Sequence, residues 1–142
     1  MDLIDRILEL YRYGYQCAQI LAILADETIG EEHPEIVRAM GGLNTGVGFS
    51  GGCCGCMTAG CCIISLFTAK PDPLSYDSPY HREALVEFTK WFTELAEEQF
   101  DSVNCDDITE GMPSKRLEFC PQLIAQSYEK IMEVLESKGL LP

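Results

Sequence analysis

Eight cysteines and a run of glycines are the residues of this 142-residue sequence whose types and spacing could do chemistry. Five of the eight cysteines and eight of the twelve glycines fall within residues 41–62. Cysteine thiolates are nucleophiles and soft metal ligands, and glycine allows main-chain N–H groups to approach an anion closely. The segment therefore predicts a site that either binds a metal or runs dithiol chemistry. A tightly packed turn is the structural alternative.

Four cysteines are predicted to lie at or near helix N-termini. Cys17 opens an apolar segment, Cys54 follows the glycine-rich loop, Cys105 precedes two aspartates, and Cys120 precedes a proline. A helix N-terminus presents free N–H groups and the positive end of the helix dipole, which together stabilise a thiolate or an anionic cluster. Four such ends, if they converge, would suit an anionic group.

The other four cysteines have alternative interpretations. Cys53 and Cys56 form a C-x-x-C, the spacing of thiol-disulfide enzymes, but no βαβ unit surrounds it. Cys61 and Cys62 lie inside a predicted helix, where a cysteine is more often a small core residue than a ligand. Structural zinc sites usually combine two short cysteine knuckles, and the sequence offers no second one.

The glycine-rich loop also matches G-x-G-x-x-G over residues 46–51. Because no strand precedes the match and the loop contains no lysine or arginine, nucleotide binding is not supported. We expect the loop instead to direct N–H groups at sulfur atoms, with Gly51, Gly52 and Gly55 as the glycines that contact a cofactor.

Charge and composition limit the partners and the compartment. A formal net charge of −13, with only ten Lys and Arg residues, argues against binding to nucleic acid or to an anionic membrane. The N-terminal residues lack the pattern of a secretory signal, and no apolar run is as long as a membrane span. We therefore expect a cytoplasmic protein, whose reduced thiols favour metal or redox chemistry over a disulfide framework.

Hydrophobic periodicity predicts an all-α, single-domain bundle of about five to six helices over residues 1–142, with a Gly/Cys-rich loop. Helices are expected over residues 2–13, 17–25, 34–40 and 54–67, from Pro79 onward, and from Pro121 to Gly139. Residues 69–78 form a proline-rich linker, and residues 100–119 are less regular.

The cysteine pattern resembles the C_GCAxxG_C_C family of redox proteins. Cys17, the pair Cys54-Gly55, Cys105 and Cys120 have the order and spacing of that family over nearly the whole chain. The sequence departs from a C-G-A-x-x-G reading, because Cys56 replaces the alanine and Ala59 stands where the second glycine is expected. Cys53, Cys61 and Cys62 are further additions.

The resemblance implies a small helical redox protein of anaerobic metabolism. Since a related domain in split-Soret-type cytochromes carries an iron–sulfur centre, it also implies a cluster, [2Fe–2S] being our expectation. By resemblance the ligands are Cys17, Cys54, Cys105 and Cys120, with Cys53, Cys56, Cys61 and Cys62 as additional thiols.

The first functional hypothesis is thus an iron–sulfur protein that transfers electrons to or from a basic redox partner. The second is a metal-free thiol-disulfide or sulfur-relay oxidoreductase that uses Cys53 and Cys56. A third is a zinc-stabilised interaction module. A homodimer is compatible with a helical domain of this size, and whether the protein is an enzyme is left open by the sequence.

Overall fold

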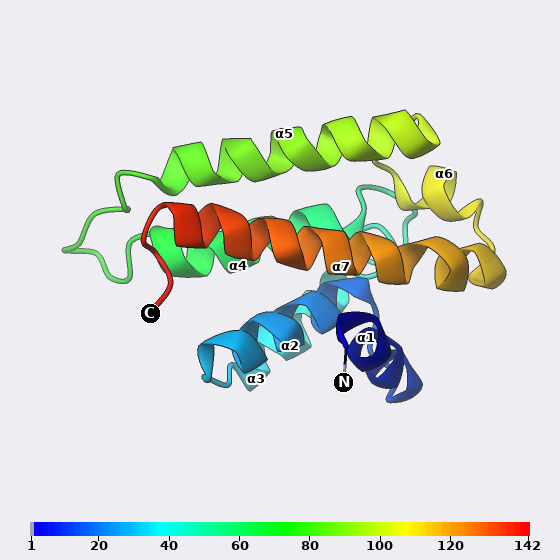
Figure 1. The fold of residues 1–142 in the computed structure, drawn as a ribbon, viewed down its shortest axis with the longest axis horizontal. Helices are drawn as coiled ribbons and strands as arrows, with labels where there is room; N and C mark the ends of the chain where they lie inside the picture. Colours follow the sequence, from blue (N-terminus) through cyan, green and yellow to red (C-terminus); the bar gives the residue numbers. More distant parts are fainter. Residues whose placement is uncertain (1) are drawn as a thin grey trace.

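Residues 2–142, which the computed structural model describes, form seven α-helices and one short 3-10 helix, with an isolated β-bridge but no strand. The all-α prediction is therefore confirmed. Figure 1 shows α4, α5 and α7 lying lengthwise beside one another, with α1, α2 and α3 on one side. The elements are α1 (Leu3–Arg12), α2 (Cys17–Ile29), α3 (Pro34–Met40), η1 (Gly41–Leu43), α4 (Gly55–Thr68), α5 (His81–Phe100), α6 (Cys105–Thr109) and α7 (Pro113–Ser137).

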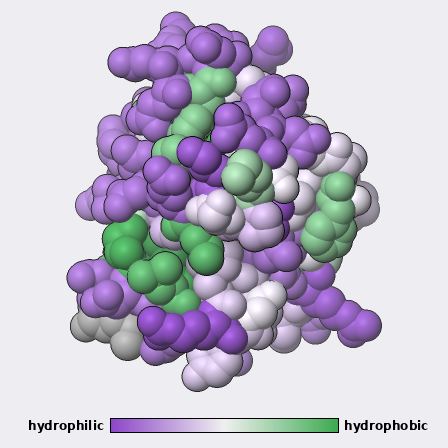
Figure 2. All heavy atoms as spheres, turned by 90° about the vertical axis from the view of Figure 1, so that its right-hand side faces the viewer, coloured by the Kyte–Doolittle hydropathy of each residue, from purple (hydrophilic) through white to green (hydrophobic). Residues whose placement is uncertain are grey.

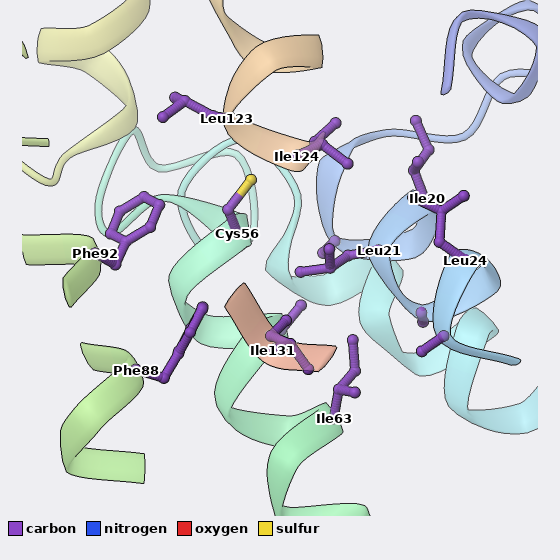
Figure 3. Close-up of a cluster of buried hydrophobic side chains, with 14 of the residues drawn as sticks. Ile20, Leu21, Leu24, Cys56, Ile63, Phe88, Phe92, Leu123, Ile124 and Ile131 are labelled. Carbon is purple, nitrogen blue, oxygen red and sulfur yellow. The ribbon is translucent and has the colours of Figure 1, made fainter. Parts of the chain in front are cut away.

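Helix α4 lies among three other helices, because it contacts α2, α5 and α7. Its sequence is apolar on nearly every face, as expected of a helix surrounded by others. Gly60 of α4 lets α5 approach, since a Cβ there would lie 2.4 Å from the ring of Phe88. Figure 3 shows the side chains that surround α4, among them Leu21, Phe88, Phe92, Leu123, Ile124 and Ile131.

Three of the four expected helix starts agree with the structure. Helix α2 begins at Cys17, Cys54 caps α4, and α6 begins at Cys105. The expected start at Pro121 is wrong, because α7 begins at Pro113 and contains Pro121 in its interior. Cys120 therefore lies within a long helix, and no free N–H groups of a helix N-terminus stabilise its thiolate.

The loop between η1 and α4 has an unusual backbone. Five consecutive residues, 45–49, have positive φ angles between 53° and 74°. Three of them carry side chains, and each such residue in the left-handed region costs about 1–2 kcal/mol. Backbone hydrogen bonds that span five or six residues hold the loop, including Gly48 N–H to Gly42 O at 2.8 Å and Phe49 N–H to Asn44 O at 3.1 Å.

No helix within residues 2–142 combines the length and the apolar character that crossing a bilayer requires.

Candidate redox site

One small cavity brings together the four cysteines that were chosen from the sequence. Cys17, Cys54, Cys105 and Cys120 all line it, and they come from four different segments of the chain. The cavity volume is about 10 Å³, which is room for about one water molecule. The remaining lining residues are Tyr11, Gln16, Thr45, Gly55, Ile108, Thr109 and Arg116.

Backbone pairing holds the second and third cysteines side by side. Cys54 N–H donates to Val103 O at 2.9 Å, and Cys105 N–H donates to Gly52 O at 2.7 Å. An antiparallel bridge joins Cys53 to Asn104 between these two bonds. The residues before α4 and before α6 thus form a short two-stranded contact, which fixes the starts of both helices at the same place.

The first cysteine reaches this place because α4 begins with a glycine. A Cβ on Gly55 would lie 2.6 Å from Cys17 Sγ and 3.3 Å from Leu43 O. The sulfur therefore occupies space that any other residue at position 55 would need. Thr45 strengthens the contact between this loop and α2, since its hydroxyl donates to Gln16 Oε1 at 2.9 Å.

Cys54 is the cysteine of this group whose pKa is lowered. A hydrogen bond from the Cys56 thiol is the largest cause, and backbone N–H groups of Cys56 and Met57 also act on it. These N–H groups belong to the first turn of α4, where a thiolate acting as cap is stabilised. Cys54 is thus the thiol best prepared to carry a negative charge.

Cys56 is the proton donor of this pair. It is fully buried, and its pKa is raised well above the ordinary value because it donates to Cys54 and because burial disfavours its thiolate. The charges of Cys17 and Cys120 raise the pKa of Cys56 further, so Cys56 lies close to the cavity cysteines although it does not line the cavity. Figure 3 shows its sulfur pointing from α4 toward α7.

The remaining three cavity cysteines have raised pKa values. Burial is the largest cause in each case, and it raises the pKa of Cys17 to about 12. The charge of Cys54 adds to the effect at Cys17, Cys105 and Cys120. Several thiolates in one small, poorly hydrated space repel each other, so a cation bound among them would favour the charged forms of all.

Arg116 and Tyr11 also line the cavity, and sequence reasoning missed both. The Arg116 charge lowers the pKa of Cys105, Cys120 and Tyr11, although burial raises each of these values overall. Arg116 Nε is buried and has no hydrogen-bond partner among the described residues. This acidic protein therefore places one of its few cations beside its group of thiols.

Cys53, Cys61 and Cys62 do not line this cavity. Cys53 Sγ lies 3.7 Å from Met57 Sδ, so the C-x-x-C cysteine pairs with a methionine while Cys56 pairs with Cys54. Cys61 is half-buried, and burial raises its pKa to about 11. Cys62 is exposed on a different groove, which α2, α3 and α4 line.

The three glycines expected to contact a cofactor, Gly51, Gly52 and Gly55, differ in their contacts. Gly55 contacts the site, but Gly51 and Gly52 use their N–H groups within the loop, donating to Thr45 O and Gly46 O. The backbone N–H groups that reach Cys17 are those of Ala18 and Thr45. Gly51 and Gly52 act instead as acceptors, because their carbonyls receive the N–H groups of Asp106 and Cys105.

No group of three or more His, Cys, Asp or Glu side chains in residues 2–142 has the spacing of a metal site. The sulfurs around the cavity would therefore have to move toward a shared metal.

No curated protein and no solved structure matches the chain. A family model does match, over residues 15–134, and its description is "Putative redox-active protein (C_GCAxxG_C_C)". The G-C-A-x-x-G part of that description has the spacing of Gly55, Cys56 and Gly60, with Met57 in place of the alanine. By this spacing Cys56, and not Cys54, corresponds to the motif cysteine, and we correct the earlier alignment. Because the matched range covers most of the sequence, the chain belongs to this redox-active protein family.

Proposed function

We propose that the protein binds an iron–sulfur cluster at the four-cysteine cavity and transfers electrons to a partner protein. The observation that carries the proposal is the convergence of Cys17, Cys54, Cys105 and Cys120, from four segments, on one cavity. Folding brings together thiols that are up to about a hundred residues apart, and oxidation is a liability for free thiols in close proximity. A bound soft metal is a physical reason to keep them together.

The donor set fits such a group. The described residues that line the cavity include four thiols and no carboxylate, and thiolates are the ligands that hold iron–sulfur clusters. When bound, a cluster supplies a one-electron donor and acceptor. Arg116 offsets negative charge, and the N–H groups of Ala18 and Thr45 stabilise the Cys17 sulfur. Such hydrogen bonds and charges are what set the potential of a thiolate-bound centre.

Either Cys54 or Cys56 would supply the ligand from α4. Cys54 lines the cavity and has the lowered pKa, whereas Cys56 corresponds to the family motif. The two thiols interact, since the interaction lowers the pKa of Cys54 and raises that of Cys56, so a small movement of the α4 N-terminus would exchange them.

Anaerobic reconstitution tests the proposal. The protein is purified without oxygen, supplied with iron and sulfide, and analysed for iron, zinc, acid-labile sulfide and visible absorption. We expect stoichiometric iron and sulfide, lost in Cys17→Ser and Cys120→Ser but retained in Cys61→Ser and Cys62→Ser, whose sulfurs lie elsewhere. Comparing Cys54→Ser with Cys56→Ser identifies the ligand from α4. A folded protein that binds neither iron nor sulfide rejects the proposal, and zinc alone would favour an interaction module.

A second candidate function rests on the two cysteines at the start of α4, because their interaction lowers the pKa of Cys54 and raises that of Cys56. In metal-free protein the Cys54 thiolate would attack one sulfur of a disulfide substrate, forming a mixed disulfide and releasing one substrate thiolate. The Cys56 thiol, after losing its proton, would attack Cys54 Sγ, release the second substrate thiolate and leave a Cys54–Cys56 disulfide. The substrate gains two electrons and the protein loses two. This pairing differs from the Cys53–Cys56 pair expected from the sequence, and we propose it because Cys54 has the largest influence on the pKa of Cys56.

Alkylation of the metal-free protein tests this candidate. Cys54 should react with iodoacetamide faster than Cys61 at neutral pH, and oxidation by a small disulfide should join Cys54 to Cys56, as mapped by mass spectrometry. Equal, slow reaction of both thiols contradicts it.

We further propose that a redox partner docks through basic residues. The net charge of −13 favours such a partner, and the end of the molecule that carries α6 and the start of α7 is mostly hydrophilic, with separate hydrophobic patches (Figure 2).

A further inference from the structure

The loop between α4 and α5, residues 69–80, presents two large apolar side chains to solvent. Leu74 is 94% exposed and Tyr76 is 92% exposed. Figure 1 shows this loop projecting beyond the ends of the helices. Single exposed hydrophobic residues are common on protein surfaces, but a large side chain that projects from the surface can act as an anchor that fills a pocket of a partner.

Hydrogen bonds hold this loop in one shape. Asp72 accepts the N–H of Leu74 and the hydroxyl of Ser75, both at 2.9 Å. At the base, Lys70 N–H donates to Asp77 Oδ1 at 2.7 Å, and Ser78 N–H donates to Thr68 O at 2.7 Å. A loop that is already ordered loses little conformational entropy when it binds, so its exposed side chains are suited to act as anchors.

An apolar groove lies next to the base of the same loop. It runs between α2, α3 and α4, has a volume of about 280 Å³, and includes Leu66 and Phe67 at the end of α4. This volume is many times that of the cysteine cavity, which is about 10 Å³. Asp26 is the one charged residue among the described residues that line it, and His33 hydrogen-bonds to that carboxylate at 2.8 Å.

We propose that two copies of this chain associate by exchanging these features, the 69–80 loop of each copy inserting Leu74 and Tyr76 into the groove of the other. A two-fold dimer requires one surface that complements itself, and a loop adjoining a groove is such a surface. A tyrosine side chain buries roughly 150–250 Å², and a leucine side chain buries roughly 60–120 Å², since its burial is worth about 1.5–3 kcal/mol at about 25 cal/mol per Å². Two loops, with an equal area from the two grooves, would then bury roughly 800–1,500 Å², which reaches the lower part of the range of stable interfaces.

Charge distinguishes a second copy from a basic partner at this surface. Two chains of net charge −13 repel each other at long range, so self-association should tighten as salt screens the repulsion. A basic partner held by ion pairs would show the opposite dependence. Within the loop, both aspartates already accept hydrogen bonds, so apolar contacts carry the proposed interface.

The proposed dimer leaves the cysteine cavity free. Cys54 lies at the N-terminal end of α4 and the groove residues Leu66 and Phe67 lie at the C-terminal end, about 20 Å apart along a helix of this length. The dimer and the cluster are therefore independent, and either can fail without the other.

Sedimentation equilibrium of the full chain tests the dimer, in protein kept reduced, from about 1 to 500 µM and at low and high salt. We expect a dimer that tightens with salt and that Leu74→Asp and Tyr76→Asp each weaken at least roughly tenfold. Both residues are exposed, so the variants should fold. Leu117→Asp is the matched control, because Leu117 is 60% exposed on α7 and should leave the dimer unchanged.

Alkylation of Cys62 gives a second readout, since this exposed thiol lines the groove. Iodoacetamide should modify Cys62 more slowly at high protein concentration in the wild type, and the concentration dependence should vanish in Leu74→Asp. A chain that stays monomeric throughout, or a dimer that neither loop variant weakens, would overturn the proposal.

Discussion

At the scale of single residues, Arg116 places a positive charge beside the cysteine cavity of this acidic protein. Its charge lies beside Cys105 and Cys120, in surroundings too buried for water to screen it fully. If the proposed cluster binds, Arg116→Gln removes a positive charge that favours the reduced, more negative form. We expect the midpoint potential to fall, on the order of 50–100 mV.

Lys115→Gln is the matched control for this variant. Lys115 is the neighbouring cation but its amine lies over the Phe119 ring, 5.7 Å from the centroid, and it does not line the cavity. Electrochemistry of the reconstituted variants makes the comparison. Equal shifts in both would show that only the total charge matters and would contradict a specific role for Arg116.

Gly55 gives a prediction that needs no cofactor. Gly55→Ala places a Cβ 2.6 Å from Cys17 Sγ, so the Cys17 side chain or one of the helices α2 and α4 must shift. Overpacking of this kind costs about 1–3 kcal/mol of unfolding free energy. Urea denaturation measures the change, and Gly42→Ala is the control, because nothing lies within 4 Å of a Cβ at position 42. Equal stability of the two variants would mean that the contact is easily relieved.

The sequence predicted the cavity cysteines but not their surroundings. The order and spacing of the cysteines can be read from the sequence. The place of Arg116 beside them can be inferred only once α7 is known to begin at Pro113. Arg116 then lies one helical turn before Cys120 and on the same face. Because the helix was expected to start at Pro121, this relation was hidden.

At the scale of elements, the same helix shows where local signals mislead. Both Pro113 and Pro121 could occupy the first position of a helix, where proline is common, and an internal proline costs about 3 kcal/mol. The chain nevertheless continues through Pro121, because α7 buries Cys120, Leu123 and Ile124 against its neighbours. Tertiary packing of this kind cannot be read from propensity alone.

The turn between α2 and α3 predicts a pH dependence. Asp26 accepts the His33 ring N–H and the His33 backbone N–H, at 2.8 and 2.9 Å, and the ring bond raises the pKa of His33. The protonated ring therefore stabilises the folded state fully below about pH 6.5, its unfolded value, and this stabilisation is lost as the pH rises through the raised pKa.

Thermal unfolding of wild type and His33→Gln between about pH 5.5 and 8.5 measures this contribution. The difference in melting temperature between the two proteins should be largest at the acidic end and shrink toward the basic end. A constant difference would mean that the ion pair does not stabilise the turn.

At the scale of the whole molecule, negative charge should set how the protein responds to salt. The chain has twenty-three acidic residues and only ten lysines and arginines, so repulsion between negative charges destabilises the compact folded state. Raising the salt concentration at neutral pH should increase the melting temperature by roughly 2–5 °C, because repulsion is screened beyond a Debye length of about 8–10 Å.

The Leu74→Asp variant is the protein to use, so that the proposed dimer does not contribute. Circular dichroism measures the transition, and the increase should shrink near the isoelectric point of about 4.4. A melting temperature that does not change with salt concentration at neutral pH would contradict the prediction.

The overall class was predictable because helical periodicity is repeated along most of the chain. The start of the short α6 was predicted at Cys105, but its extent was not, since Cys105–Thr109 is too brief to show a period, and its position beside α4 depends on the pairing of Cys105 with Gly52. The left-handed run at residues 45–49 was also invisible, because Thr45, Val47 and Phe49 are residues that rarely adopt positive φ.

The positive φ angles of residues 45–49 favour amino acids of the D configuration. At positive φ the Cβ of an L-amino acid lies too close to the following carbonyl oxygen, whereas the Cβ of a D-amino acid does not. At Gly48, φ is +61° and nothing lies within 4 Å of an L-type Cβ. In a chemically synthesised chain, D-alanine at position 48 should therefore be accepted more readily than L-alanine, which makes this stretch a place where the protein favours the opposite hand.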